Sequence, residues 1–258
     1  MRRLILAAGC ALLPLAASQA NASLNITLTG NYWNASPSGS IQGNSTEQPL
    51  DVERQLGLSS EGMNNVAVQF DHFIPVVPNF RLTQTQLDFS GRSSEEVTFK
   101  GQQFTGEVQS QVDLSHTDIT AYYRLLDNLT AFVPLVSLRL ELGLTARIFD
   151  GGFEVRSGQA ASSEDLSLPV PMGYVGGLVS LPKGVSVGAR MNYMSFSDSS
   201  LSDLKVFANY EYDGLPLITP GLTLGYRQFS LDLDDLDDSY GDLTLKGPHL
   251  GAYLRVGF

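Results

Sequence analysis

His116 and Asp118 are the residues whose types and spacing come nearest to acid–base chemistry, since they stand two positions apart and Arg124 follows them. In an extended strand this spacing places both side chains on one face, about 7 Å apart. Catalysis further requires a nucleophile or an activated water within about 3 Å of such a pair. Ser115 has the opposite parity, so the spacing predicts no catalytic triad. We expect a structural histidine and no enzyme activity, with a hydrolase acting on lipid or peptide as the alternative.

Metal chemistry has candidate ligands in the sequence but no recognisable motif. The three histidines, His72, His116 and His249, are widely separated. The acidic run 232–238 is dense enough in carboxylates to hold Ca²⁺ or Mg²⁺, but Leu236 occupies the third ligand position of an EF-hand and no glutamate closes the loop. We expect a solvated outer loop that meets lipopolysaccharide through shared divalent cations. No catalytic, cofactor-binding or metal-binding residue is assigned, and no cofactor is expected.

Charged side chains share one face of alternating segments along the whole chain. Eight of them are basic and four are acidic, although the chain carries a net charge of −11. The sequence therefore predicts a basic interior and places the acidic surplus in loops. Paired charges would plug a narrow barrel, whereas unpaired cations would form a constriction that favours small anions. The candidate network consists of Asp71, Arg81, His116, Asp118, Arg124, Arg139, Glu141, Arg147, Arg190, Lys205, Glu211, Arg227 and Arg255.

Ten segments of alternating apolar and polar residues would position these side chains, since a period of two indicates a strand with one apolar face. The segment 138–148 is the clearest, because leucine, alanine and isoleucine occupy every second position. Ten strands are predicted, or eight if 80–90 or 171–181 belongs to a loop. The predicted strands are 23–33, 65–74, 80–90, 112–125, 138–148, 171–181, 185–196, 203–212, 221–230 and 244–258.

The connections between these segments alternate in length. Such alternation is typical of outer-membrane barrels, which have short periplasmic turns and longer outer loops. Leu231 and Leu233 reverse the parity of the ninth segment and predict a β-bulge near Ser230. Short turns are predicted at 75–79, 126–135, 182–184 and 213–220, and outer connections, mostly long and polar, at 34–63, 91–110, 150–170, 197–202 and 231–243.

Both ends of the chain point to export and to the outer membrane. Residues 1–22 have a basic start, a short apolar stretch and an Ala-Asn-Ala site, which is typical of a cleaved signal peptide. The last segment ends in Leu254, Val256 and Phe258, which we expect the barrel-assembly machinery to recognise. The sequence thus predicts an all-β protein, a transmembrane antiparallel up-and-down β-barrel forming one domain over 23–258, whose last strand pairs near the first.

Composition excludes several other classes of protein. An acidic chain with no basic cluster is a poor partner for nucleic acid. Cys10, the single cysteine, lies in the predicted signal peptide, so the mature chain would have no disulfide. A soluble exported β-sandwich or lipocalin-like barrel shares the alternation. Apolar outward rows that end in Tyr and Phe fit the interfacial girdles of a membrane barrel better.

Several motifs resemble a small, largely uncharacterised family of proteobacterial (Gram-negative) outer-membrane β-barrel proteins. Members tend to have Glu-His-Pro where this chain has Asp-His-Phe at 71–73, and a shorter turn where it has 129–136. The resemblance implies the barrel fold and no assigned activity. Because members are associated with bacteria that sort surface proteins through a Gly-Gly C-terminal system, it also implies a surface-protein partner. The segments that resemble the family are 71–79, 114–118, 122–128, 149–151, 225–227 and 245–251.

From these observations we expect an integral outer-membrane barrel with a structural or surface-interaction role and a largely plugged lumen. A narrow pore for small anionic solutes and an outer-membrane enzyme are the alternatives. Outer-membrane lipid, lipopolysaccharide and the barrel-assembly machinery are the expected partners.

Overall fold

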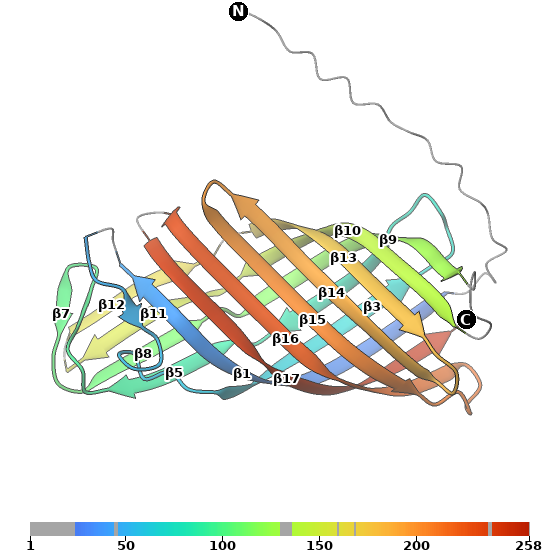
Figure 1. Ribbon diagram of the computed structural model, residues 1–258, viewed down its shortest axis with the longest axis horizontal. Coiled ribbons are helices and arrows are strands. Elements are labelled where there is room, and N and C mark those ends of the chain that lie inside the picture. The colour runs from blue at the N-terminus through green and yellow to red at the C-terminus, as the bar shows by residue number, and fades with distance from the viewer. Residues whose placement is uncertain are drawn as a thin grey trace, which may run out of the picture.

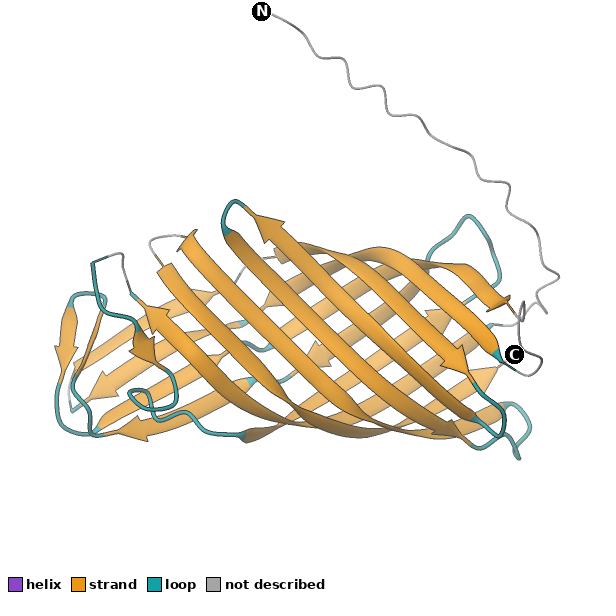
Figure 2. Ribbon diagram, in the orientation of Figure 1, coloured by secondary structure: helices purple, strands orange, loops and turns teal. Residues whose placement is uncertain are grey.

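The computed structural model describes residues 24–43, 46–129, 136–158, 160–167, 169–236 and 239–257, and every regular element in these ranges is a strand (Figure 2). None of these residues belongs to a helix with the length and hydropathy needed to cross a membrane. The predicted signal peptide and Phe258 lie outside the described residues.

Ten strands form a closed antiparallel barrel in which neighbours in the sequence are neighbours in space (Figure 1). The barrel closes where the last strand pairs with the first, from Asn25–Gly257 to Gln42–Tyr240. The count of ten and the pairing of the last strand with the first confirm the sequence prediction. The strands are β1 (Asn25–Gln42), β3 (Glu61–Asp71), β4 (Asn79–Thr85), β9 (His116–Leu129), β10 (Ser137–Phe149), β13 (Pro169–Ser180), β14 (Val185–Phe196), β15 (Ser199–Glu211), β16 (Ile218–Leu236) and β17 (Ser239–Gly257).

Alternation along each strand separates an apolar outer face from the interior. On β10, Leu142 and Leu144 are 54% and 71% exposed, whereas Glu141, Thr145 and Arg147 are buried. Exposed apolar side chains form similar rows on the other barrel strands. Such a belt is stable only against lipid, because a soluble protein rarely exposes so large a continuous apolar surface.

A second layer of strands extends the barrel beyond its outer end, opposite the end where β1 begins and β17 finishes (Figure 1). The order β12-β11-β8-β5 makes one four-stranded sheet, and β6 and β7 make a hairpin. These elements, with the short β2, are β2 (Leu50–Asp51), β5 (Asp88–Ser93), β6 (Val97–Phe99), β7 (Gln102–Phe104), β8 (Val108–Asp113), β11 (Gly151–Ser157) and β12 (Ala160–Leu166).

The structure corrects several sequence predictions. The connections 34–63, 91–110, 150–170 and 231–243, expected to be mostly long polar loops, contain strands whose polar residues alternate with buried apolar ones such as Phe104 and Val108. The predicted strand 80–90 is two strands, β4 and β5, separated at Gln86 and Leu87.

The predicted bulge near Ser230 is absent, since Ser230 pairs in regular register with Ser202 and Thr244. The register shift between β16 and β17 lies instead between Leu233 and Leu236. Phe229 and Leu231 face inward without any change of parity, because the interior itself becomes apolar toward the outer end.

Candidate functional site: the barrel interior

A layer of four charged side chains crosses the middle of the barrel. Arg147 on β10 donates two hydrogen bonds to Asp118 on β9, each 2.7 Å long, and a third of 2.7 Å to Asp203 on β15. Asp203 also accepts two bonds from Arg227 on β16, at 2.9 and 2.7 Å. Two strands, β13 and β14, separate β10 from β15 in the wall. The Arg147–Asp203 pair therefore links separated parts of the wall through the interior.

Aromatic rings cover this charged layer. The guanidinium of Arg227 lies over the indole of Trp33 at 4.6 Å, and that of Arg147 lies over Phe229 at 5.5 Å. Trp33 itself is 1% exposed, and its Nε1 donates to the carbonyl of Gly247. Cations are favoured over aromatic faces, most of all where water is excluded. The two arginines are thus held by carboxylates within the layer and by rings next to it.

A second cluster lies nearer the end of the barrel that carries the termini. Arg81 on β4 reaches Glu141 at 3.5 Å and the Tyr174 hydroxyl at 3.0 Å, and Tyr174 donates to Glu141. Arg81 also lies over the Tyr122 ring at 5.0 Å. The close approach leaves no room at Gly176, where a Cβ would stand 2.8 Å from the Tyr174 hydroxyl oxygen and 2.9 Å from Glu141 Oε2.

The remaining predicted charges surround a hollow at the periplasmic end. Asp71 binds Arg124 at 2.6 Å, and Glu211 pairs with Arg255. Among the described residues, neither Arg190 nor Lys205 pairs with a carboxylate within 4.0 Å. Arg190 lies over Phe207 instead. The hollow has a volume of about 140 Å³, and its charged lining is Asp71, Arg124, Arg139, Arg190, Lys205, Glu211 and Arg255, with five basic residues and two acidic.

His116 and Asp118 do not form an open acid–base site. His116 is fully buried, its Nδ1 bonds the carbonyl of Leu114 at 2.8 Å, and its ring packs against Phe149 and Phe229. Asp118 is held by Arg147, so the pair has no room for a substrate.

Ligand atoms of His116, Asp118 and Asp203 lie within 4.8 Å of one another, a spacing that could hold a metal ion. Both carboxylates already bind guanidinium groups, so a cation there would meet Arg147 and Arg227 instead of free ligands. The donor set does not fit a metal. His72 bonds the carbonyl of Pro78 in the turn after β3. His249 is buried inside the barrel.

Beyond the charged layer the interior is apolar up to the outer extension. The connection after β2 folds inward, and Val52 and Leu56 are fully buried there. A cavity of about 540 Å³ lies at the outer end and is lined largely by apolar side chains. The interior thus consists of a cationic hollow, a neutralised charged layer and an apolar core.

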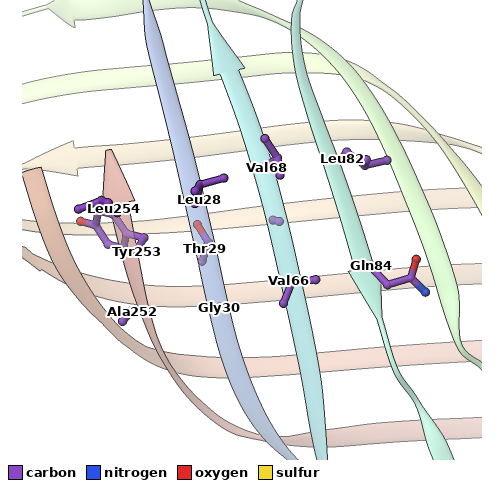
Figure 3. A pocket seen from close by; sticks show the side chains of 11 residues that line it. Leu28, Thr29, Gly30, Val66, Val68, Leu82, Gln84, Ala252, Tyr253 and Leu254 are labelled. Atoms are coloured by element: carbon purple, nitrogen blue, oxygen red, sulfur yellow. The ribbon is translucent and has the colours of Figure 1, made fainter. Parts of the chain in front are cut away.

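A shallow depression in the lipid-facing belt lies over β17, β1, β3 and β4 (Figure 3). It arises because Gly30 pairs directly with Ala252, so the row of larger side chains is interrupted there. Leu28, Val66 and Val68 form its rim. Lipid chains would cover this surface in a membrane, so the depression adds nothing to the interior site.

Sequence reasoning missed several residues that complete the interior. Asp203 shares the inward parity of Lys205 and could have been found from that signal. Tyr122, Tyr174 and Trp33 also have inward parity. Their residue type did not mark them as interior residues, because aromatic side chains occur both on the lipid-facing surface and inside a barrel. Leu254, part of the predicted assembly signal, lies on the apolar outer face and is 38% exposed.

Comparison with known proteins adds little to this geometry. A search with protein-family models finds no match, and neither does a search of the curated proteins. A Pseudomonas aeruginosa FadL homologue is similar at 10% identity and a TM-score of 0.36, over 92% of this chain and 90% of that one. The Pseudomonas putida toluene transporter TodX is similar at 9% identity and a TM-score of 0.28, over 90% and 89%. At these scores the likeness carries no argument about function. The closed barrel and its apolar belt by themselves make the chain an outer-membrane β-barrel protein.

Proposed function

We propose that this chain is a non-conducting outer-membrane barrel with a structural or surface-interaction role. The observation that carries the proposal is the Arg147–Asp203 ion pair through the lumen, with Arg147 0% exposed. An ion crossing the barrel would have to break these buried pairs and then enter an apolar core, and both steps carry a large desolvation cost.

The outer extension supports an interaction at the cell surface. Its sheet carries a polar hollow of about 410 Å³, lined by Arg92, Gln109, Gln111, Glu154 and Arg156 among others. Both signs of charge and several amide groups are available there for hydrogen bonds to a protein. We propose a surface protein as the partner. Lipopolysaccharide and the barrel-assembly machinery are further proposed partners, and we propose no enzyme activity.

A narrow anion path is the second candidate, and the cationic hollow at the periplasmic end favours it. Arg190 and Lys205 face that hollow without a carboxylate within 4.0 Å among the described residues, so they are available to small anions. This candidate requires the charged layer to open, whereas the first requires it to stay closed.

Planar-bilayer recording separates the two candidates. The refolded protein is inserted alongside a conducting porin as a positive control, and heat-modifiable migration on a gel verifies folding. We expect no steady single-channel current, and steady current would overturn the first candidate. If current appears, reversal potentials in a salt gradient, with and without Arg190→Glu and Lys205→Glu, decide whether the path prefers anions.

A further inference from the structure

We propose that a notch in the barrel wall between β13 and β14 admits the acyl chain of an outer-leaflet lipid into the apolar cavity. The ladder between these strands begins only at the pair Gly173–Tyr193. Toward the outer end, β13 stays paired with β10 as far as Pro169, and β14 stays paired with β15 as far as Phe196. About three residues on each edge therefore lack a partner across the notch, which corresponds to roughly 10 Å of strand.

Two prolines explain why the ladder ends. Pro169 and Pro171 pair with Ile148 and Ala146 on β10. Along an antiparallel ladder, pairs that exchange two N–H···O bonds alternate with pairs that exchange none. Since proline has no N–H, both prolines occupy the second kind of pair toward β10, and their nitrogens face β14. At both positions β14 meets a strand that cannot donate, so pairing stops.

The cavity at the outer end reaches both edges of the notch. Pro171 and Ser195, which have the outward parity, line it together with Val170 and Met194, which have the inward parity. Its volume of about 540 Å³ lies within the range of roughly 300–1,000 Å³ that is usual for small-molecule sites. The buried side chains in its lining are largely apolar and include Ile41, Phe149, Leu201, Leu231 and Leu243.

The location of the notch favours a lipid acyl chain as the occupant of the cavity. Pro169 pairs with Ile148, the last exposed apolar residue on the outward row of β10, and Tyr193 beside the notch is 48% exposed. The notch thus opens at the outer border of the apolar belt, where hydrocarbon chains are the solvent. The charged side chains in the lining are one lysine and two aspartates, so the cavity has no cationic excess with which to select an anionic headgroup.

Photolabelling tests the proposal in the reconstituted protein. Vesicles contain a phosphatidylcholine whose acyl chain carries a diazirine, and mass spectrometry maps the labelled peptides. The variant Val170→Cys/Phe196→Cys, in a Cys10→Ser background, places cysteines across the notch so that oxidation draws its edges together. The control Val175→Cys/Met191→Cys makes the same tie between residues that are already paired.

In the reduced protein we expect label on inward residues of β15 and β16, as well as on the belt. Oxidation of the notch pair should reduce the inward label to background, and oxidation of the control pair should leave it unchanged. The variant Pro169→Val/Pro171→Val, which restores both donors, should lose the inward label without any disulfide.

Label confined to the belt, or inward label that survives closure of the notch, would overturn the proposal. The labelling is repeated with a free diazirine fatty acid added to the medium. If this fatty acid labels the cavity equally when the disulfide closes the notch, the ligand enters from the medium and not through the wall, and the proposal is overturned. The inference goes beyond the non-conducting role, and a conductance measurement leaves it untouched, so the two can fail separately.

Discussion

Removal of the Arg147 guanidinium offers the sharpest test of the charged layer. In Arg147→Met, Asp118 loses both of its guanidinium bonds, whereas Asp203 keeps its two bonds to Arg227. Because one buried carboxylate is left without a partner, we expect the free energy of unfolding to fall by about 3–5 kcal/mol. Replacing both partners, in Arg147→Met/Asp118→Leu, should cost clearly less than the sum of the two single changes, because neither charge is then left unpaired.

The assay is reversible denaturant unfolding of the protein refolded in lipid vesicles. Trp33 is the only tryptophan in the chain, and its indole lies against Arg227 in the same layer, so its fluorescence reports on this region directly. Heat-modifiable migration on a gel provides an independent measure of the folded fraction. Additive losses in the double variant would refute the reasoning, since they would mean that the two side chains do not interact in the folded state.

Two further changes test the packing of the interior and the placing of the belt. Gly176→Val should lower the free energy of unfolding by about 1–3 kcal/mol, because its side chain would displace the Glu141–Tyr174 pair. The control Gly177→Ala should change it little, because its Cβ would lie 3.7 Å from its nearest neighbour. Equal losses in the two variants would contradict the packing. Leu144→Arg should lower the free energy of unfolding by about 2–4 kcal/mol, because that residue faces lipid near the middle of the membrane. The control Gln111→Arg, on the exposed extension, should have almost no effect. Both pairs are measured by the same unfolding assay, and a tolerated arginine at 144 would mean that the belt is misplaced.

The barrel was predictable because its signal is local. In a strand with lipid on one side and protein on the other, apolar residues recur at every second position. On β10 they do so from Leu138 to Ile148 without interruption. The outer extension escaped prediction for a related reason. Its strands bury their apolar residues in short groups among many serines and glutamines, so their composition is that of loops, as at Gln102–Phe104.

The sequence by itself determined which side chains face inward, because parity depends only on the position of a residue along its strand. Only the tertiary structure decided how those side chains pair. Asp203 and Arg147 are 56 positions apart, and the closure of the barrel brings them to 2.7 Å. The same holds for the notch: Pro169 and Pro171 are visible in the sequence, but their lost donors matter only because β10 takes one side of β13 and leaves the other for β14. Parity is a property of one strand, whereas pairing depends on the register of all ten.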